Sequence, residues 1–261
     1  MKLLVIGDIV GRSGLDRLKE ELPKLIKNKN IDFCIVNGEN SAGGKGLRNK
    51  EYDEIISYGA DCITMGNHLY YRKEMAKEYI NLSKLLIPAN ITNIEGNDNL
   101  IIDKNNIKLG VINLVGRAEM GEVFKKNATN PFNEALKQID ILKQKGAQYI
   151  VIDFHAEATA EKIALAHYLK DTVNCIFGTH THVQTADETI FDSGMAYITD
   201  VGMVGPSDSV LGLKKEIAIN RFLTESYIKY ECSDNKAIFN GIVVEFDEFT
   251  KKAISIKRIN M

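Results

Sequence analysis

The sequence of 261 residues lacks tryptophan and contains only four prolines and four cysteines. The cysteines form no C-x-x-C pair, and Cys34, Cys62 and Cys175 lie in apolar runs, which indicates buried thiols in a reducing cytosol. No apolar run approaches the roughly 18 residues that span a membrane. The apolar start also gives way at Gly7-Asp8, too early for a signal peptide. We therefore expect a cytoplasmic protein that does not enter a membrane.

The chain also lacks a strong charge of either sign, since 33 Lys and Arg stand against 35 Asp and Glu, for a formal net charge of −2. This balance argues against a general nucleic-acid coat or a binder of anionic membranes. RNA is thus disfavoured as a partner, although the sequence leaves it open. A small anionic substrate remains compatible, because bound divalent ions would make a site locally positive.

Apolar strands alternate with amphipathic helices along most of the chain. Short buried runs at residues 3–6, 33–36, 62–65, 149–154 and 173–177 each end in polar or Gly-rich loops, which favours parallel strands joined by helical crossovers. No linker, repeat or low-complexity tract interrupts the pattern. The sequence predicts one α/β domain with a mixed sheet, covering residues 1–261.

Several local predictions can be tested against the structure. Pro23 should kink or split the first helix, and residues 73–80 should form another helix. Asn105-Asn106 should turn a hairpin, whereas 202–212 reads as a loop. The tail, at 227–231, 237–246 and 253–259, reads as a three-stranded meander, whose exposed edge could support a homo-oligomer.

Polar residues with side chains that can bind metal follow the ends of five predicted buried strands. They are Asp8, Glu39-Asn40, Asn67-His68, His155 and the pair His180-x-His182. Because the carboxyl ends of strands share one edge of an open sheet, residues distant in sequence converge there. A His-x-His pair can point both imidazoles at one place if the backbone turns.

The mixture of carboxylate, amide and imidazole suits manganese, iron(II) or catalytic zinc rather than a structural zinc site. There are too many candidates for one ion, and two ions bridged by a carboxylate would use them all. Simpler readings exist for single residues, since Asp8 could cap a helix, Asn37-Gly38 is a turn signal and His155 could be a core histidine. His167 lies mid-helix and is not expected to belong to a site, while Asp153 and Glu157 could support the ligands.

In these polar residues and the blocks around them, the sequence resembles the calcineurin-like metallophosphoesterases, specifically the YmdB-type 2′,3′-cyclic-nucleotide 2′-phosphodiesterases. The matching blocks are G-D-I-V-G (7–11), N-G-E-N-S-A-G-G-K-G (37–46), I-T-M-G-N-H (63–68), D-F-H-A-E-A-T (153–159), G-T-H-T-H-V-Q-T-A-D (178–187) and Y-I-T-D-V-G-M (197–203). Together they extend over nearly the whole chain.

The resemblance implies a four-layered α/β sandwich, with mixed sheets flanked by helices, that carries two divalent metal ions, iron or manganese first and zinc as an alternative. It implies that Asp8, Asn40 and His182 bind one ion. It implies further that Asn67, His155 and His180 bind the other, and that Glu39 bridges the two. The histidine expected two residues after Asp8 in the wider superfamily is absent, and Asn40 would supply the missing ligand.

The chain departs from the resembled family after His68, where Leu69-Tyr70-Tyr71 stands in place of Thr-Trp-Asp, and again after Arg117. Both departures fall near the expected substrate position, so they bear on substrate choice rather than on metal binding. Lys45, in the Gly-rich loop, could reach a phosphate, although such a loop also forms an ordinary flexible turn.

The functional hypothesis is hydrolysis of a small phosphodiester, a 2′,3′-cyclic or also a 3′,5′-cyclic nucleotide, by a metal-bound hydroxide, with His68 as the general acid. One alternative is a phosphomonoesterase or nucleotidase on the same metal pair. Another is a regulatory protein that senses a nucleotide or RNA with little turnover.

Overall fold

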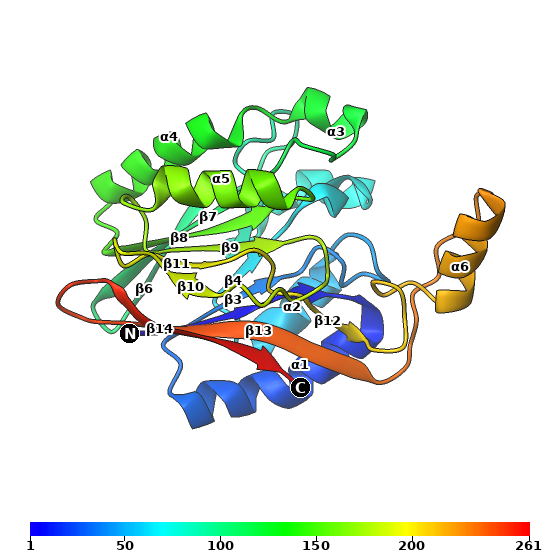
Figure 1. Cartoon of the computed structure of the whole chain (residues 1–261), viewed down its shortest axis with the longest axis horizontal. Coiled ribbons are helices and arrows are strands. Elements are labelled where there is room, and N and C mark those ends of the chain that lie inside the picture. Colours follow the sequence, from blue (N-terminus) through cyan, green and yellow to red (C-terminus); the bar gives the residue numbers. More distant parts are fainter.

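The computed structural model describes residues 1–261, apart from the side chain of Val123, and contains two mixed β-sheets packed between layers of helices (Figure 1). The strands of the larger sheet are β1 (Lys2–Ile6), β2 (Asp8–Ile9), β3 (Phe33–Asn37), β4 (Cys62–Thr64), β5 (Leu85–Leu86), β12 (Met203–Pro206), β13 (Ala237–Phe246) and β14 (Ala253–Asn260). Those of the smaller sheet are β6 (Asn99–Lys104), β7 (Ile107–Val115), β8 (Tyr149–His155), β9 (Cys175–Thr179), β10 (Thr189–Ile190) and β11 (Ala196–Ile198).

The α-helices are α1 (Gly11–Lys29), α2 (Asn49–Ser57), α3 (Glu122–Asn127), α4 (Pro131–Gln144), α5 (Thr159–Leu169) and α6 (Lys215–Thr224). Three short 3-10 helices are η1 (Asn67–Tyr70), η2 (Lys73–Lys77) and η3 (Tyr79–Asn81). The helices α4 and α5 cover the outer face of the smaller sheet, α1 lies under the larger sheet, and α6 projects from the body (Figure 1). The expected four-layered α/β sandwich is therefore confirmed.

Side-chain alternation along the strands builds these layers. Leu3 and Val5 of β1 share a cluster of buried apolar residues with Phe177 of β9, between the two sheets. Leu4 and Ile6 belong instead to the cluster that packs the larger sheet against α1 and α2. The strand is buried on both faces, which explains its unbroken apolar run.

The strand order places the site. The larger sheet has the order β2-β12-β13-β1-β3-β4-β5, with β14 paired to β13, and the smaller has the order β10-β11-β9-β8-β7-β6. Strands β1, β3, β4 and β5 are parallel, as are β7, β8, β9 and β11. Their carboxyl ends therefore share an edge in each sheet, where loops can bring distant residues together.

Two helix predictions differ from the structure, the one at Pro23 only in its second alternative, a split of the helix. Helix α1 continues through Pro23, so the proline does not split it, and buried Leu18, Leu22 and Leu25 anchor the helix on both sides of the proline. The predicted helix at 73–80 is wrong, since 3-10 turns η2 and η3 occupy this segment. Each turn buries one large side chain, Met75 or Tyr79.

The C-terminal third also differs from its prediction. The segment 202–212 is not only a loop, because it contains β12, which pairs with β2 and β13. The predicted strand at 227–231 is wrong: Tyr227 is 91% exposed, and the segment forms no strand. The hairpin at Asn105-Asn106 is confirmed, with φ angles of 52° and 63° at the two residues. The described residues include no helix whose length and apolar character would suffice for a membrane span.

Candidate metal centre

The polar residues predicted at five strand ends all lie together at the carboxyl edge of the two sheets. Asp8 begins β2, Glu39 and Asn40 follow β3, and Asn67 and His68 form the start of η1 after β4. From the smaller sheet, His155 ends β8, and His180 and His182 follow β9. Seven candidate ligands, predicted from positions 8 to 182, therefore lie in one place between the sheets.

One group of candidate ligands surrounds the amide of Asn40. Its Nδ2 atom lies 3.3 Å from Asp8 Oδ1 and 3.1 Å from His182 Nε2. His182 Nε2 is 3.7 Å from Asp8 Oδ1, and His182 Nδ1 donates to the Leu211 carbonyl over 3.0 Å. That second contact fixes which ring nitrogen faces the group and is typical of a metal-binding histidine.

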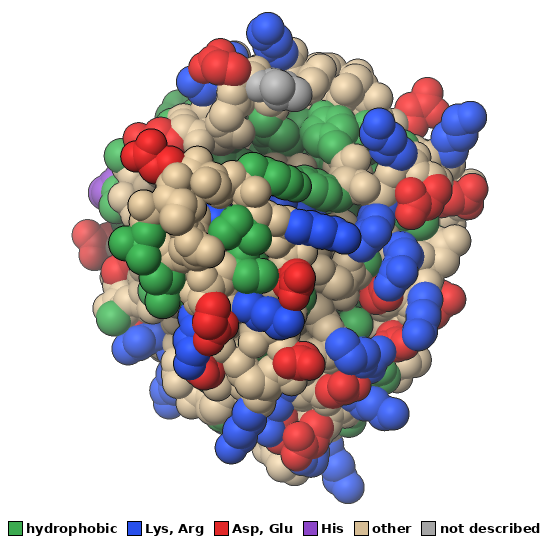
Figure 2. Space-filling model, turned by 90° about the vertical axis from the view of Figure 1, so that its right-hand side faces the viewer, with side chains coloured by type: hydrophobic (Ala, Val, Ile, Leu, Met, Phe, Trp, Pro, Cys, Tyr) green, Lys and Arg blue, Asp and Glu red, His purple; other side chains and the backbone are tan. Residues whose placement is uncertain are grey.

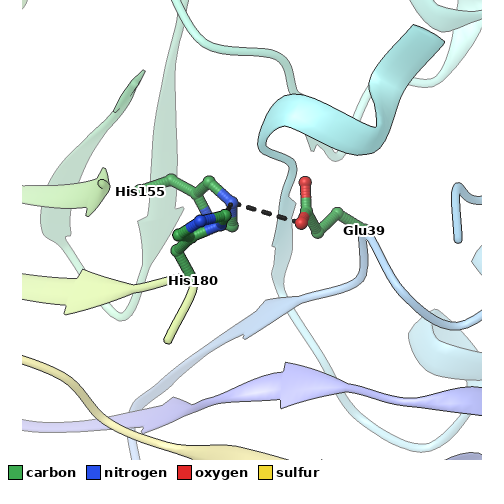
Figure 3. Close-up of side chains that lie close together, drawn as sticks. All are labelled: Glu39, His155 and His180. Atoms are coloured by element: carbon green, nitrogen blue, oxygen red, sulfur yellow. Dashed lines mark hydrogen bonds and ion pairs between the residues drawn. The ribbon is translucent and has the colours of Figure 1, made fainter. Parts of the chain in front are cut away.

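A second group surrounds His155. Its Nε2 atom is 2.9 Å from Asn67 Oδ1 and 3.0 Å from His180 Nδ1. Glu39 joins the two groups, because its Oε1 atom is 3.2 Å from His155 Nε2 and 3.3 Å from Asn40 Nδ2. Figure 3 shows the Glu39 carboxylate facing the adjacent rings of His155 and His180.

These spacings fit shared ions. Ligand atoms bound to one ion at about 2.0–2.2 Å lie roughly 3 Å from one another, which is the spacing found within each group. The Asn40 amide can present its oxygen by a half-turn of the side chain. The residues are therefore suitably spaced to hold divalent metal.

The buried acids of the cluster attract positive charge: burial lowers the pKa of His155, but nearby Glu39 raises it to about 9. Burial raises the pKa of Asp8 well above its ordinary value, and nearby Glu39 raises it further, against the opposing effect of His155. Burial would also raise the pKa of Glu39, but His155 and His68 lower it well below its ordinary range. Burial and then His155 lower the pKa of His180 to about 3, which leaves that imidazole neutral at pH 7 and its lone pair available.

The backbone is shaped to bring the ligands together. His180 and His182 both lie in the left-handed region, with φ of 100° and 64°, a conformation that costs on the order of 1–3 kcal/mol and concentrates at functional sites. Gly66 allows a close approach: a Cβ there would lie 2.3 Å from His155 Nε2 and 2.4 Å from Glu39 Oε2. Any larger residue at this position would displace two candidate ligands.

Buried polar residues behind the cluster orient it. Asp153 accepts from Thr179 Oγ1 over 2.7 Å, and the same hydroxyl lies 2.9 Å from His155 Nδ1. Glu157 Oε2 is 3.0 Å from His180 Nε2. Of the two acids suggested as supports, Glu157 thus contacts a candidate ligand directly, and Asp153 reaches one through Thr179.

Sequence reasoning missed a buried ion pair beneath the histidine loop. Lys162 Nζ donates to Asp200 Oδ2 and to the Thr179 carbonyl, each over 2.8 Å, and Asp200 also accepts from the Thr181 amide. Both side chains are almost fully buried. A lysine on the otherwise apolar face of α5 was the available signal, because buried lysines require a partner.

His68 lies at the rim of the site. Its backbone N–H donates to Glu39 Oε2 over 3.0 Å, and its Nδ1 atom is 3.2 Å from Glu39 Oε1. The ring meets Tyr71 edge-on, with centroids 5.0 Å apart. His167, expected to have no part in a site, lies on α5 against Phe191 and belongs to neither group of candidate ligands.

A four-layered α/β sandwich with these candidate ligands at its strand ends defines a metallophosphoesterase, a class of hydrolytic enzyme. Within that class the chain belongs to the YmdB-like protein family, whose family model matches residues 4–259. It is 44% identical over 262 residues to a 2′,3′-cyclic-nucleotide 2′-phosphodiesterase of Bacillus subtilis, covering 99% of this chain and 96% of the relative.

Two solved structures are similar over the whole chain. The crystal structure of a novel phosphatase from Mycoplasma pneumoniae has a TM-score of 0.92 at 37% identity and covers 100% of this chain and 93% of that one. A hypothetical protein from Thermus thermophilus has a TM-score of 0.90 at 31% identity, covering 100% of this chain and 99% of that one. The family and fold implied by the sequence motifs are therefore confirmed.

Proposed function

We propose that the protein is a dinuclear-metal phosphodiesterase that hydrolyses 2′,3′-cyclic nucleotides. The observation that carries the proposal is the division of seven candidate ligands into two groups that share Glu39. The activity named for the Bacillus subtilis relative supports the substrate class. The same proposal extends to the cleavage of 3′,5′-cyclic nucleotides.

In this proposal Asp8, Asn40 and His182 hold one ion, Asn67, His155 and His180 hold the other, and Glu39 bridges them. When bound, two divalent ions would orient the phosphate, activate the attacking water and stabilise the charge that develops. Imidazole, amide and carboxylate ligands favour iron or manganese, with zinc as the alternative. The neutral state of His180 and the fixed tautomer of His182 prepare these side chains for that task.

His68 is the proposed general acid, which donates a proton to the leaving alkoxide. Its backbone bond to Glu39, together with contacts of ring Nδ1 with Glu39 Oε1 and Asn40 Oδ1, holds it beside the site. Its side chain is 19% exposed, so it can meet a substrate. Proton donation of this kind contributes about 10²–10⁴-fold.

The direct test compares His68→Ala with His180→Ala. We expect His68→Ala to keep its metal and to lose activity by about 10²–10⁴-fold, whereas His180→Ala loses both metal and activity. Elemental analysis of anaerobically purified protein, together with hydrolysis of a 2′,3′-cyclic nucleotide, gives the two readouts. Full activity in metal-depleted wild-type protein would refute the proposal.

A second candidate function is a phosphomonoesterase on the same metal pair, favoured by the phosphatase named for the Mycoplasma pneumoniae structure. Faster release of phosphate from a nucleoside monophosphate than cleavage of a cyclic nucleotide would favour it. Tight nucleotide binding with negligible turnover in manganese or iron(II) would favour a regulatory sensor instead.

Three further proposals concern the setting of the enzyme. The free, buried thiols of Cys34, Cys62 and Cys175 support a reducing, cytoplasmic location. We also propose that residues 1–261 form one domain and that the protein assembles as a homo-oligomer. Limited proteolysis and light scattering test these two points.

A further inference from the structure

A recess of about 730 Å³ is lined by Tyr71, whose ring packs against His68 at the rim of the candidate metal centre. Its volume is within the range of about 300–1,000 Å³ typical of ligand pockets. The Gly-rich loop at 43–45, the residues that follow η1 and the arm at 221–230 form its walls. Its main charged and aromatic side chains are Lys45, Tyr71, Arg72, Arg221, Lys229 and Tyr230. On the face that Figure 2 shows, Lys and Arg side chains lie close to side chains of the hydrophobic class.

Tyr71 is the wall between the recess and the metal centre. Its ring lies perpendicular to that of His68, at a centroid distance of 5.0 Å. Lys45 Nζ donates to the Tyr71 hydroxyl over 2.9 Å and lies 4.5 Å from the Tyr71 ring centroid and 5.0 Å from that of Tyr230. A ligand extending past His68 would therefore enter a space bounded by aromatic rings and a cation.

The recess is strongly basic in a chain of net charge −2. Among the described residues, four cationic side chains line it, against the single carboxylate of Glu225. The guanidinium groups of Arg72 and Arg221 donate to backbone carbonyls, at Lys45 over 3.2 Å and at Ile228 over 3.0 Å. Those bonds position the cations without neutralising their charge.

This charge exceeds what a cyclic mononucleotide needs. Such a substrate carries one phosphate, which the metal centre would take, so the four cations would face no anion. A nucleotide strand supplies a further phosphate and base with each residue. Basic grooves lined by aromatic rings bind single strands in this way, with phosphates on the cations and bases on the rings.

We propose that the recess binds the nucleotides on the 5′ side of a 2′,3′-cyclic phosphate, so that the physiological substrate is the 3′ end of a single-stranded RNA. This inference rests on the proposed phosphodiesterase function. It also gives a role to Tyr71, which falls where the sequence departs from the resembled family pattern, and to the loop lysine Lys45.

The test measures kcat/KM for a 2′,3′-cyclic mononucleotide and for a tetraribonucleotide ending in a 2′,3′-cyclic phosphate. We expect wild type to prefer the tetranucleotide, and Lys229→Ala to reduce that preference by about tenfold, because a phosphate contact is lost. Lys50→Ala is the matched control: it removes one exposed cation on α2, outside the recess, and should leave the preference within about twofold. Equal kcat/KM for both substrates, unchanged by Lys229→Ala, would overturn the inference.

Two further measurements separate the outcomes. A 2′,3′-cyclic mononucleotide that bears a 5′-phosphate tests whether a second phosphate alone suffices; if it matches the tetranucleotide, the strand proposal fails. Fluorescence anisotropy with a labelled tetraribonucleotide measures binding without turnover. If no substrate is hydrolysed but Lys229→Ala still weakens this binding, the recess stands and the proposed catalytic function fails.

Discussion

The candidate metal centre and the arm that carries α6 are built in opposite ways. At the metal centre, Asp8, Glu39 and His155 are fully buried, and each makes several polar contacts with residues from other parts of the chain. On the arm, Phe222 is 84% exposed and Leu223 is 78% exposed. The comparison suggests that the chemistry depends on a rigid, over-determined scaffold, whereas substrate choice depends on parts that few contacts constrain.

The largest expected effect comes from breaking the support beneath the metal centre. Lys162→Met leaves Asp200 as a buried charge without its cation, so we expect the free energy of unfolding to fall by about 3–5 kcal/mol. Chemical denaturation of the metal-free protein measures this loss. The double variant Lys162→Met with Asp200→Asn removes both charges and should regain part of the stability. If the single variant is as stable as wild type, the histidine loop does not depend on this ion pair.

Gly66 gives the next largest effect, on activity rather than on folding. In Gly66→Ala the new Cβ would press on His155 and Glu39, and a misplacement of about 1 Å costs about 10²-fold in rate. Steady-state kinetics with metal analysis measures it. Gly121→Ala is the matched control, because its added Cβ meets no atom within 4 Å, although its φ is 82°. Wild-type kinetics in Gly66→Ala would show that the site tolerates displacement of Glu39, the proposed bridging ligand.

The same contrast explains how far the sequence alone could predict the structure. Asp8, Glu39 and His155 each follow a buried apolar run, and parallel strands bring such positions to one edge of a sheet. The cluster could therefore be predicted from the sequence. The pairing of Lys162 with Asp200 could not be predicted from the sequence, because α5 and the loop after β11 meet only in the folded chain.

The arm and the recess were the least predictable parts. Alternating apolar residues at 227–231 indicated a strand, yet no neighbouring strand among the described residues pairs with it, and Tyr230 instead packs against Gly44 and Lys45. The basic character of the recess was also hidden. Its cations come from four separate places along the chain, so a net charge of −2 gives no sign that they gather.

The smallest expected effect is on the arm itself. Phe222 is almost fully exposed on α6, so Phe222→Ser should change the free energy of unfolding by less than about 0.5 kcal/mol. The contrasting variant is Leu165→Ala on α5, where a fully buried side chain should cost about 2–5 kcal/mol. Thermal unfolding at two protein concentrations checks both. If Phe222→Ser costs more than about 1 kcal/mol, and the loss grows with concentration, then a second copy of the chain covers α6 in solution. The exposed arm would then be an interface between two copies, and it would no longer contrast with the metal centre as a part that few contacts hold.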